Sequence, residues 1–162
     1  MFERISQHVY IKAPEGYSDR PTIGYIKGDK LSLLFDSGAS KYHTDEIKKD
    51  LESASLPYPS LVTLSHWHWD HSFGLSEWNV PSIAGKETNK MLKKLSALRW
   101  DEESIKERIQ KREEIVFCFE MMKREYKDTR NIKVVPASIE FENELHIDLG
   151  GIEARLIHIS GP

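Results

Sequence analysis

The sequence predicts a mixed α/β fold with its helices and strands in layers, and three observations support this prediction. Short β-rich runs occupy the beginning of the chain, residues 86–130 are highly charged and lack glycine and proline, and strand patterns return after residue 132. Strands, helix, strand, helices and strands in this order are typical of a layered domain. The chain has 162 residues, which is enough for one domain with its own core.

The first three strands are expected at residues 8–11, 22–26 and 31–35, where β-branched and aromatic residues recur. The Gly-Asp-Lys sequence at 28–30 is a turn signal, so the second and third strands should form a hairpin. Asp-Ser-Gly at 36–38 then ends the third strand, because polar side chains can bond the backbone of a tight loop.

A helix is expected over residues 41–51, since Ile47 and Leu51 lie four residues apart on one face. Two downstream prolines end this segment. Residues 61–64 form a short apolar run, which predicts a strand that is buried on both sides.

Residues 86–130 contain 23 charged residues among 45, which favours helix. We expect two amphipathic helices with solvated outer faces, the longer one starting after Asp101 as its N-cap. Met91, Leu95 and Leu98 form the apolar stripe of the first helix. The stripe of the second helix consists of Ile105, Ile109, Val116, Phe119 and Tyr126. Alternatively, the region is a lid or an interface that shapes the access of substrate.

Strand patterns follow in the last part of the chain, with polar or glycine-rich turns between the later runs. The expected strands are 133–135, 139–141, 145–149 and 152–159, and the expected turns are 142–144 and 150–151.

The composition excludes several classes of protein. The formal net charge of -3 argues against nucleic acid or an anionic membrane as the main partner, and no apolar run approaches the length of a membrane helix. Cys118 is the single cysteine, so no intramolecular disulfide can form, and we expect it to be a small buried hydrophobe. The N-terminus shows no signal-peptide pattern, and a cytoplasmic location is the simplest expectation.

Residues 66–71, His-Trp-His-Trp-Asp-His, concentrate metal-ligand chemistry directly after the apolar strand expected at 61–64. We call this segment the hexad. Neutral imidazole suits zinc, iron or nickel, and a carboxylate beside it leaves the site hard enough to hold a water on the metal. The carboxyl end of a strand is also where α/β folds place their ligands. His8, His43 and His146 are isolated, and we expect them to be structural or exposed.

The candidate metal ligands are His66, His68, Asp70 and His71. Alternation along an extended chain puts the first two on one face, and the last two should lie at the start of the next helix, facing the same pocket. Four ligands at one corner can serve two adjacent metals. Two divalent ions about 3.5 to 4 Å apart can deprotonate a water and polarise the bond that it attacks. The two interleaved tryptophans would exclude water from the site.

This pattern resembles the signature of the metallo-β-lactamase superfamily, His-x-His-x-Asp-His after a buried strand, and the match is complete at His66, His68, Asp70 and His71. The resemblance covers residues from about 8 to 85 and resumes at 134, with the helical stretch between being more particular to a subgroup. Further segments that resemble the family are 33–38, 63–65 and 74–75.

The resemblance implies an αββα sandwich, of which residues 1–162 would form a single incomplete domain, the first half, with a charged helical insertion at 86–130. It also implies two Zn²⁺ ions in a complete site, with iron or manganese as alternative metals. His66 and His68 would help hold one metal, and Asp70 and His71 the other. Asp70 would be the catalytic residue that orients the attacking water.

The family uses three further ligands, and residues 156–162 resemble the strand and turn that lead to the first of them. His158 lies on the strand before that turn and is not assigned as a ligand. Two protein ligands per metal should bind weakly, because zinc normally takes three or four. The inner sheet face, with Leu33, Val62 and Leu64, would lack a partner layer, so we expect homo-oligomers or pairing with a missing carboxyl-terminal half.

The expected function is a metal-dependent hydrolase that acts on a small-molecule ester, thioester or lactone. Two alternatives remain: a non-catalytic truncated fragment that keeps part of the metal site, and an iron-containing redox protein on the same scaffold. A nuclease is disfavoured, because the helical region carries 13 basic against 10 acidic residues and so lacks a strongly basic surface for phosphates.

Overall fold

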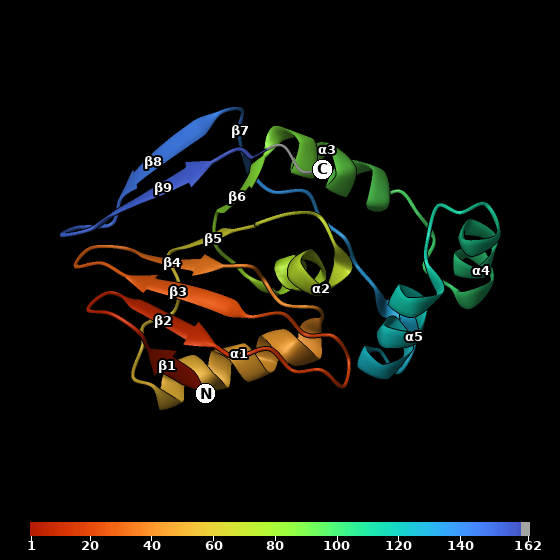
Figure 1. Ribbon diagram of the computed structural model, residues 1–162, viewed down its shortest axis with the longest axis horizontal. Coiled ribbons are helices and arrows are strands. Elements are labelled where there is room, and N and C mark those ends of the chain that lie inside the picture. Colours follow the sequence, from red (N-terminus) through yellow and green to blue (C-terminus); the bar gives the residue numbers. More distant parts are fainter. Residues whose placement is uncertain (160–162) are drawn as a thin grey trace.

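A computed structural model describes residues 1–159, which form a seven-stranded mixed sheet, five α-helices and a separate two-stranded hairpin (Figure 1). The strands of the large sheet are β1 (Phe2–Arg4), β2 (Val9–Lys12), β3 (Ile23–Lys27), β4 (Ser32–Phe35), β5 (Leu61–Thr63), β6 (Ser82–Gly85) and β7 (Ile139–Phe141). The hairpin consists of β8 (Glu144–Asp148) and β9 (Glu153–Ile157). The helices are α1 (Lys41–Ser53), α2 (Trp69–Ser72), α3 (Lys86–Leu95), α4 (Glu102–Gln110) and α5 (Val116–Glu125), with short 3-10 turns η1 (Phe73–Glu77) and η2 (Thr129–Asn131).

The strands of the large sheet follow chain order from β1 to β7. β1 to β4 pair in antiparallel fashion, whereas β4 to β7 are parallel. In the parallel half Leu34 of β4 lies opposite Val62 of β5, and Phe35 lies opposite Thr63. The carboxyl ends of β4 and β5 therefore meet at one edge of the sheet, and the loops that leave them lie side by side.

Each face of the sheet has its own apolar core, as strand alternation requires. Leu34 and Val62 pack with the helices in the larger core, whereas Leu33 on the opposite face packs with Leu149 and Leu156 from the hairpin. Leu33, Val62 and Leu64 are all buried, so the expectation that they share one uncovered face is wrong. The hairpin covers one side, and the helices cover the other.

The hairpin closes tightly on the turn between β3 and β4. A Cβ atom at Gly28 would lie 2.1 Å from the carbonyl oxygen of Leu149, so only glycine permits this approach. The backbone amides of Asp29 and Lys30 then donate hydrogen bonds to the carbonyls of Gly150 and Leu149 at 2.8 and 3.0 Å. The start of the second layer is thereby fixed on the first.

The helical region departs from the sequence prediction. The expected long second helix is interrupted between Gln110 and Val116, so α4 and α5 are separate, and Arg112 in the break has φ +60°. Asp101 is the N-cap of α4, as predicted, and its side chain accepts a hydrogen bond from the backbone amide of Ser104 at 3.0 Å. Val116 is 58% exposed and so does not belong to a buried stripe. α4 and α5 lie at the opposite end of the molecule from the hairpin (Figure 1).

Two further differences concern strands. The strand expected at 133–135 does not form: Val134 is buried, but the segment finds no strand to pair with. β6 was not predicted, because its Ser-Ile-Ala-Gly sequence is short and has little β-branched character, yet it pairs with both β5 and β7. In both segments, the availability of a neighbouring strand determines whether a strand forms, and local β-propensity does not.

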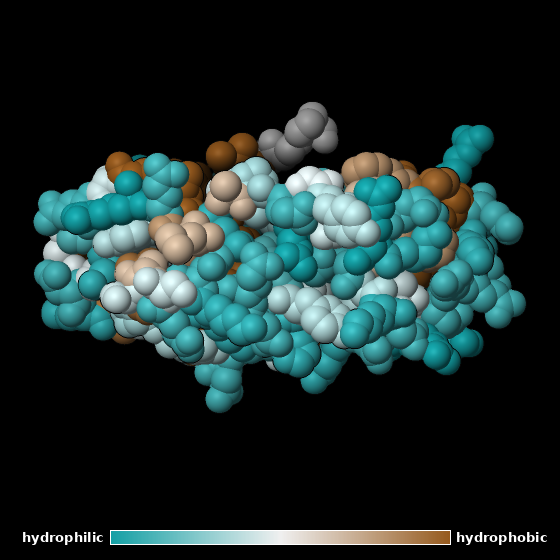
Figure 2. Space-filling view, turned by 90° about the horizontal axis from the view of Figure 1, so that it is seen from below, coloured by the Kyte–Doolittle hydropathy of each residue, from teal (hydrophilic) through white to brown (hydrophobic). Residues whose placement is uncertain are grey.

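The surface seen in Figure 2 is mostly hydrophilic, with hydrophobic residues gathered along its upper edge. Within residues 1–159, no helix has both the length and the apolar composition needed to cross a membrane.

A buried ion-pair network ties α5 to the start of α1 and to the turn at residues 15–20. Glu125, with a side chain that is 1% exposed, accepts hydrogen bonds from Ser18 Oγ at 2.7 Å and from Arg20 Nε at 2.9 Å. It also accepts a hydrogen bond from the hydroxyl of Ser40, the N-cap of α1. Arg20 continues the network to Glu46 of α1 at 2.7 Å. The end of the helical region is thereby fastened to the loop that follows β4.

Replacement of Glu125 by alanine should lower the free energy of unfolding by about 3 kcal/mol, because the largely buried Arg20 loses one of its two carboxylate partners and the hydroxyls of Ser18 and Ser40 lose their acceptor. Urea denaturation followed by circular dichroism measures this loss. Glu120→Ala on the exposed side of the same helix is the control, and it should change stability by about 0.5 kcal/mol or less. Equal losses in the two variants would contradict the importance of the network.

Candidate metal centre

The hexad leaves the carboxyl end of β5 and turns at once into α2. His68 is the N-cap residue of α2, and Asp70 and His71 lie within this helix, as the sequence predicted. Ser72 holds the turn closed, because its hydroxyl lies 2.9 Å from the carbonyl oxygens of both Trp67 and His68. The short helix therefore directs its polar side chains back over the end of the strand.

The four predicted ligands lie together. The ring centroids of His66 and His68 are 4.6 Å apart, and those of His66 and His71 are 4.2 Å apart. Nε2 of His71 lies 3.1 Å from Oδ2 of Asp70. Three imidazoles and one carboxylate thus converge at the corner between β5 and α2.

Asp36, in the loop after β4, also belongs to this centre, although the sequence analysis did not include it among the site residues. Its Oδ2 accepts a hydrogen bond from Nδ1 of His71 at 2.7 Å, and its Oδ1 accepts one from the amide of Ser65 at 2.8 Å. Ser37 adds two hydrogen bonds, from its amide and its hydroxyl, to the carbonyl oxygen of His71, each 2.9 Å long. A carboxylate behind a histidine is the usual device that orients a metal-binding imidazole.

Asp36 is 2% exposed and has φ +68°, an uncommon backbone conformation for a residue other than glycine. This strained conformation sits at the carboxyl end of the strand beside β5. The sequence does hold a signal for Asp36: it is an acidic residue directly after β4, the strand that runs parallel to the strand before the hexad.

The electrostatic surroundings shift the pKa values of His66 and His71 in opposite directions. Burial opposes the charged form of His71, but its hydrogen bonds to Asp36 and Asp70 outweigh this effect and raise its pKa to about 9. Burial lowers the pKa of His66, and the neighbouring His71 and His68 lower it further. His66 therefore favours its neutral form, which is the form that donates a lone pair to a metal.

As they stand, no three His, Cys, Asp or Glu side chains within residues 1–159 are arranged to hold a metal ion. The polar contacts explain why: Nε2 of His71 faces Asp70, and Nδ1 of His66 lies 2.9 Å from the hydroxyl of Ser65. The donor set nevertheless fits zinc, since imidazoles and a carboxylate share one corner and Asp36 leaves the Nε2 atom of His71 facing the other donors.

A cleft of about 670 Å³ opens beside the hexad and is lined by its His66 and Trp67. Apolar side chains form much of the wall, among them Met91 of α3 and Leu156 of β9. His158 lines the same cleft and is exposed, so it stays unassigned as a ligand. The predicted turn toward a further ligand falls on residues 160–162, outside the part of the chain that the structure describes.

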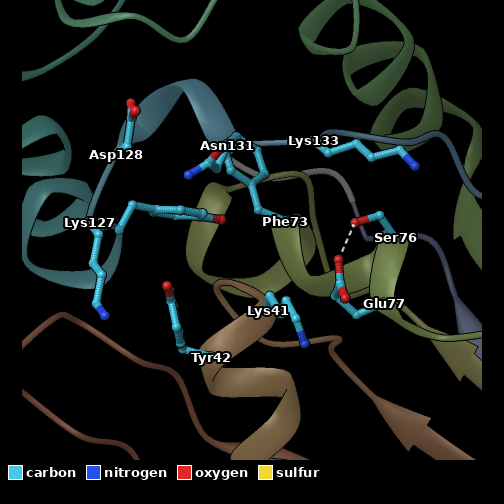
Figure 3. Close-up of a pocket in the computed structure, with 10 residues that line it drawn as sticks. Lys41, Tyr42, Phe73, Ser76, Glu77, Lys127, Asp128, Asn131 and Lys133 are labelled. Atoms are coloured by element: carbon cyan, nitrogen blue, oxygen red, sulfur yellow. Dashed lines mark hydrogen bonds between the residues drawn. The ribbon is translucent and has the colours of Figure 1, made fainter.

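A second cavity, of about 190 Å³, is lined by residues of α1, η1 and the segment after α5 and by none from the hexad (Figure 3). Its charges are mixed: Lys41, Lys127 and Lys133 share it with Glu77 and Asp128. It therefore lies apart from the candidate metal centre.

The remaining histidines and the cysteine lie outside the centre. His43 is buried, His8 is half-buried with Nδ1 2.8 Å from the carbonyl of Lys27, and His146 is exposed on β8. Cys118 is half-buried, so the expectation of a buried residue holds only in part, and burial raises the pKa of its thiol to about 11.

Comparisons with known proteins bear on the family and the fold of this chain. The profile of the metallo-beta-lactamase superfamily matches residues 19–162. The metallo-beta-lactamase of Cronobacter sakazakii with a HARLDQ motif has a similar structure, with 13% identity and a TM-score of 0.63, covering 94% of this chain and 52% of that one. The native FEZ-1 metallo-beta-lactamase from Legionella gormanii has 14% identity and a TM-score of 0.61, and the match covers 94% of this chain and 50% of that one. The metallo-beta-lactamase from Pontibacter korlensis has 16% identity and a TM-score of 0.58, and the match covers 94% of this chain and 57% of that one.

These structural matches show the fold alone, because their sequence identities are too low to carry a function over. The chain spans about half the length of the solved structures that it matches, such as the 50% of FEZ-1. None of the curated protein sequences matches the chain.

Asp36→Asn should weaken zinc binding by about 10- to 100-fold, because loss of the carboxylate behind His71 frees its ring to turn. Isothermal titration with zinc measures the affinity. Asp45→Asn is the control, since Asp45 lies on the exposed side of α1 and pairs with Lys41. Equal affinities for wild type and Asp36→Asn would show that Asp36 does not orient a ligand.

Proposed function

The chain belongs to the metallo-β-lactamase superfamily, and from that premise we propose that it is the metal-binding part of a zinc-dependent hydrolase for small esters, thioesters or lactones. The observation that supports this proposal is the convergence of His66, His68, Asp70 and His71 at the end of β5, with Asp36 behind His71. Bringing these titratable side chains together at a half-buried corner costs free energy unless a cation lies among them.

Each residue has a proposed part in the reaction. His66 and His68 would hold one metal, and His71 and Asp70 a second. Two divalent ions bound there would supply Lewis-acid activation of a water and of the bond that it attacks. Asp70 would accept a hydrogen bond from the attacking water and orient it, Asp36 would keep His71 in place, and the buried Trp69 would keep bulk water from the back of the site.

The proposed substrate class follows from the cleft beside His66. Its volume of about 670 Å³ suits a small molecule, and its lining combines apolar side chains such as Met91 and Leu156 with charged ones such as Arg155. The net charge of -3 gives no general attraction for a phosphate polymer. A small ester, thioester or lactone with an apolar part fits both observations.

Asp70→Ala should abolish hydrolysis in the complete enzyme, because the attacking water loses the group that orients it. The test measures the zinc content of the purified protein by elemental analysis and its turnover of a panel of esters, thioesters and lactones. Asp148→Ala on the exposed β8 strand is the matched control and should leave turnover unchanged. Retention of most of the rate in Asp70→Ala would remove Asp70 from the mechanism.

The same experiment separates the competing functions. Stoichiometric zinc together with hydrolysis supports the proposal. Iron as the metal found in cells would support a redox protein instead. Substoichiometric metal without hydrolysis, in a complete enzyme as well as in this chain, would support a non-catalytic module.

We also propose that this chain associates with a second copy of itself when it is isolated from a carboxyl-terminal half. The chain spans about half the length of the solved structures it matches, such as 52% of the Cronobacter protein. Its second layer within residues 1–159 has only β8 and β9, and it leaves Ile157 50% exposed and Phe35 of β4 39% exposed. Exposed apolar surface of this kind favours association.

Sedimentation velocity tests this association. A dimer or larger species should dominate at micromolar concentration, and Ile157→Lys at the exposed edge should shift the distribution toward monomer. Lys133→Glu, at an exposed position in the segment between η2 and β7, is the control. A monomer at all concentrations would contradict the proposal.

A further inference from the structure

We propose that Ser65 is a positioning residue of the candidate metal centre, whose hydroxyl connects the buried carboxylate of Asp36 to the ring of His66 and makes Nε2 the metal-binding atom of that ring. This inference rests on the proposed function. Asp36 would thereby orient one imidazole of each proposed metal, His71 by direct contact and His66 through Ser65.

Backbone hydrogen bonds fix Ser65 beside Asp36. The amide of Ser65 donates to Oδ1 of Asp36 at 2.8 Å, and the amide of Asp36 donates to the carbonyl oxygen of Thr63 at 2.8 Å. The amide of Leu64 donates to the carbonyl oxygen of Ile83 at 3.0 Å, which continues the pairing of β5 with β6. Ser65 and Asp36 therefore keep a fixed relative position at the carboxyl ends of β5 and β4.

The hydroxyl of Ser65 lies among the polar side chains of the centre. Its Oγ is 2.9 Å from both Oδ1 and Oδ2 of Asp36 and 2.9 Å from Nδ1 of His66. Nδ1 of His71 is farther away, at 3.4 Å, and has its own contact of 2.7 Å with Oδ2 of Asp36. Ser65 is thus placed to join Asp36 to His66.

The chemistry of the groups decides which atom donates in each of these contacts. An ionised carboxylate can only accept hydrogen bonds, so the single hydroxyl proton of Ser65 points to Asp36. The hydroxyl oxygen is then the acceptor for His66, which must carry its proton on Nδ1. The lone pair of the neutral His66 ring is therefore on Nε2.

This tautomer is the one that suits a metal ligand held from behind. A histidine that binds a metal through one nitrogen usually donates the other N–H to an oxygen atom, which fixes the tautomer and the orientation of the ring. His71 donates directly to Asp36, whereas His66 donates to Ser65, which in turn donates to Asp36. Loss of the Ser65 hydroxyl should therefore affect His66 first.

The contacts of Ser65 favour this role over a purely structural one. Its side chain is exposed and lines the cleft beside His66, so it adds little to the packed core. Within residues 1–159 its hydroxyl forms hydrogen bonds only with side chains of the centre: Asp36, His66 and His71. The hydroxyl therefore acts on the candidate ligands and their carboxylate.

Two histidines outside the centre supply a reference for each tautomer. Nδ1 of His8 lies 2.8 Å from the carbonyl oxygen of Lys27, which can only accept, so His8 carries its proton on Nδ1. Nδ1 of His43 accepts a hydrogen bond from the amide of Ala39 at 3.2 Å, so His43 carries its proton on Nε2. The same spectrum therefore contains both standards.

The test records ¹⁵N spectra of the histidine rings in the zinc-free chain at about pH 8, above the ordinary pKa of an imidazole. Ser65→Ala removes the hydroxyl and Ser65→Thr keeps it. Ser53→Ala is the matched control, because the hydroxyl of this exposed serine on α1 bonds to the carbonyl of Lys49. A His66→Gln spectrum assigns the signal of interest, and competition with a chromophoric chelator measures zinc affinity in the wild type and in the serine variants.

In the wild type, His66 should show the same tautomer as His8. In Ser65→Ala it should shift toward the tautomer of His43, because no acceptor then holds the proton on Nδ1. The same variant should bind zinc about 10-fold more weakly. Ser65→Thr should restore both properties, and Ser53→Ala should behave as the wild type does.

A wild-type His66 with its proton on Nε2 would overturn the inference without the need for any variant. An unchanged tautomer in Ser65→Ala would overturn it as well, even if zinc bound more weakly, because Ser65 would then have a structural role. A shifted tautomer at unchanged zinc affinity would show that the relay does not serve the metal. These outcomes leave the proposed function intact. Failure of the wild type to bind zinc would overturn the proposed function, while the spectra of the zinc-free protein would still decide whether Ser65 orients His66.

Discussion

The contact between Asp36 and His71 is the interaction on which the candidate centre depends. It joins the loop after β4 to the helix after β5, and it exists because these two strands are parallel neighbours with adjacent carboxyl ends. Asp36 is buried and has a strained backbone, and Ser65 and Ser37 hold both sides of the contact. A hydrogen bond of 2.7 Å at the back of the ring leaves its other nitrogen facing the hexad.

The rest of the fold supports this corner from two directions. One is the sheet, whose register fixes where β4 and β5 end. The other is the helical region at 86–130, whose last helix carries Glu125 and so fastens the 15–20 turn and the start of α1. The helical region is therefore part of the framework of the centre as well as a cover for one end of the sheet.

Much of the fold and the clustering of the four hexad side chains could be predicted, because both are encoded locally. The alternation in β2, β3 and β4, the face of α1 and the dense spacing of histidines all lie within a few residues of one another. Asp36 could not be assigned, since its importance comes from a neighbour distant in sequence, His71. For the same reason β6 was missed and the long helix was predicted without its break near Arg112, because pairing and packing override local propensity.

The central claim is that the hexad was assembled to hold a cation. X-ray absorption at the zinc edge on the zinc-loaded chain tests it most directly, because it reports the atoms that surround the metal. The account predicts two or more imidazole nitrogens at about 2.0 to 2.1 Å, with a carboxylate oxygen at similar distance. The imidazole signal should weaken when His66 and His68 are replaced together, because His71 is then the one imidazole of the hexad that remains. A spectrum of hydrated zinc without imidazole scattering would contradict the account.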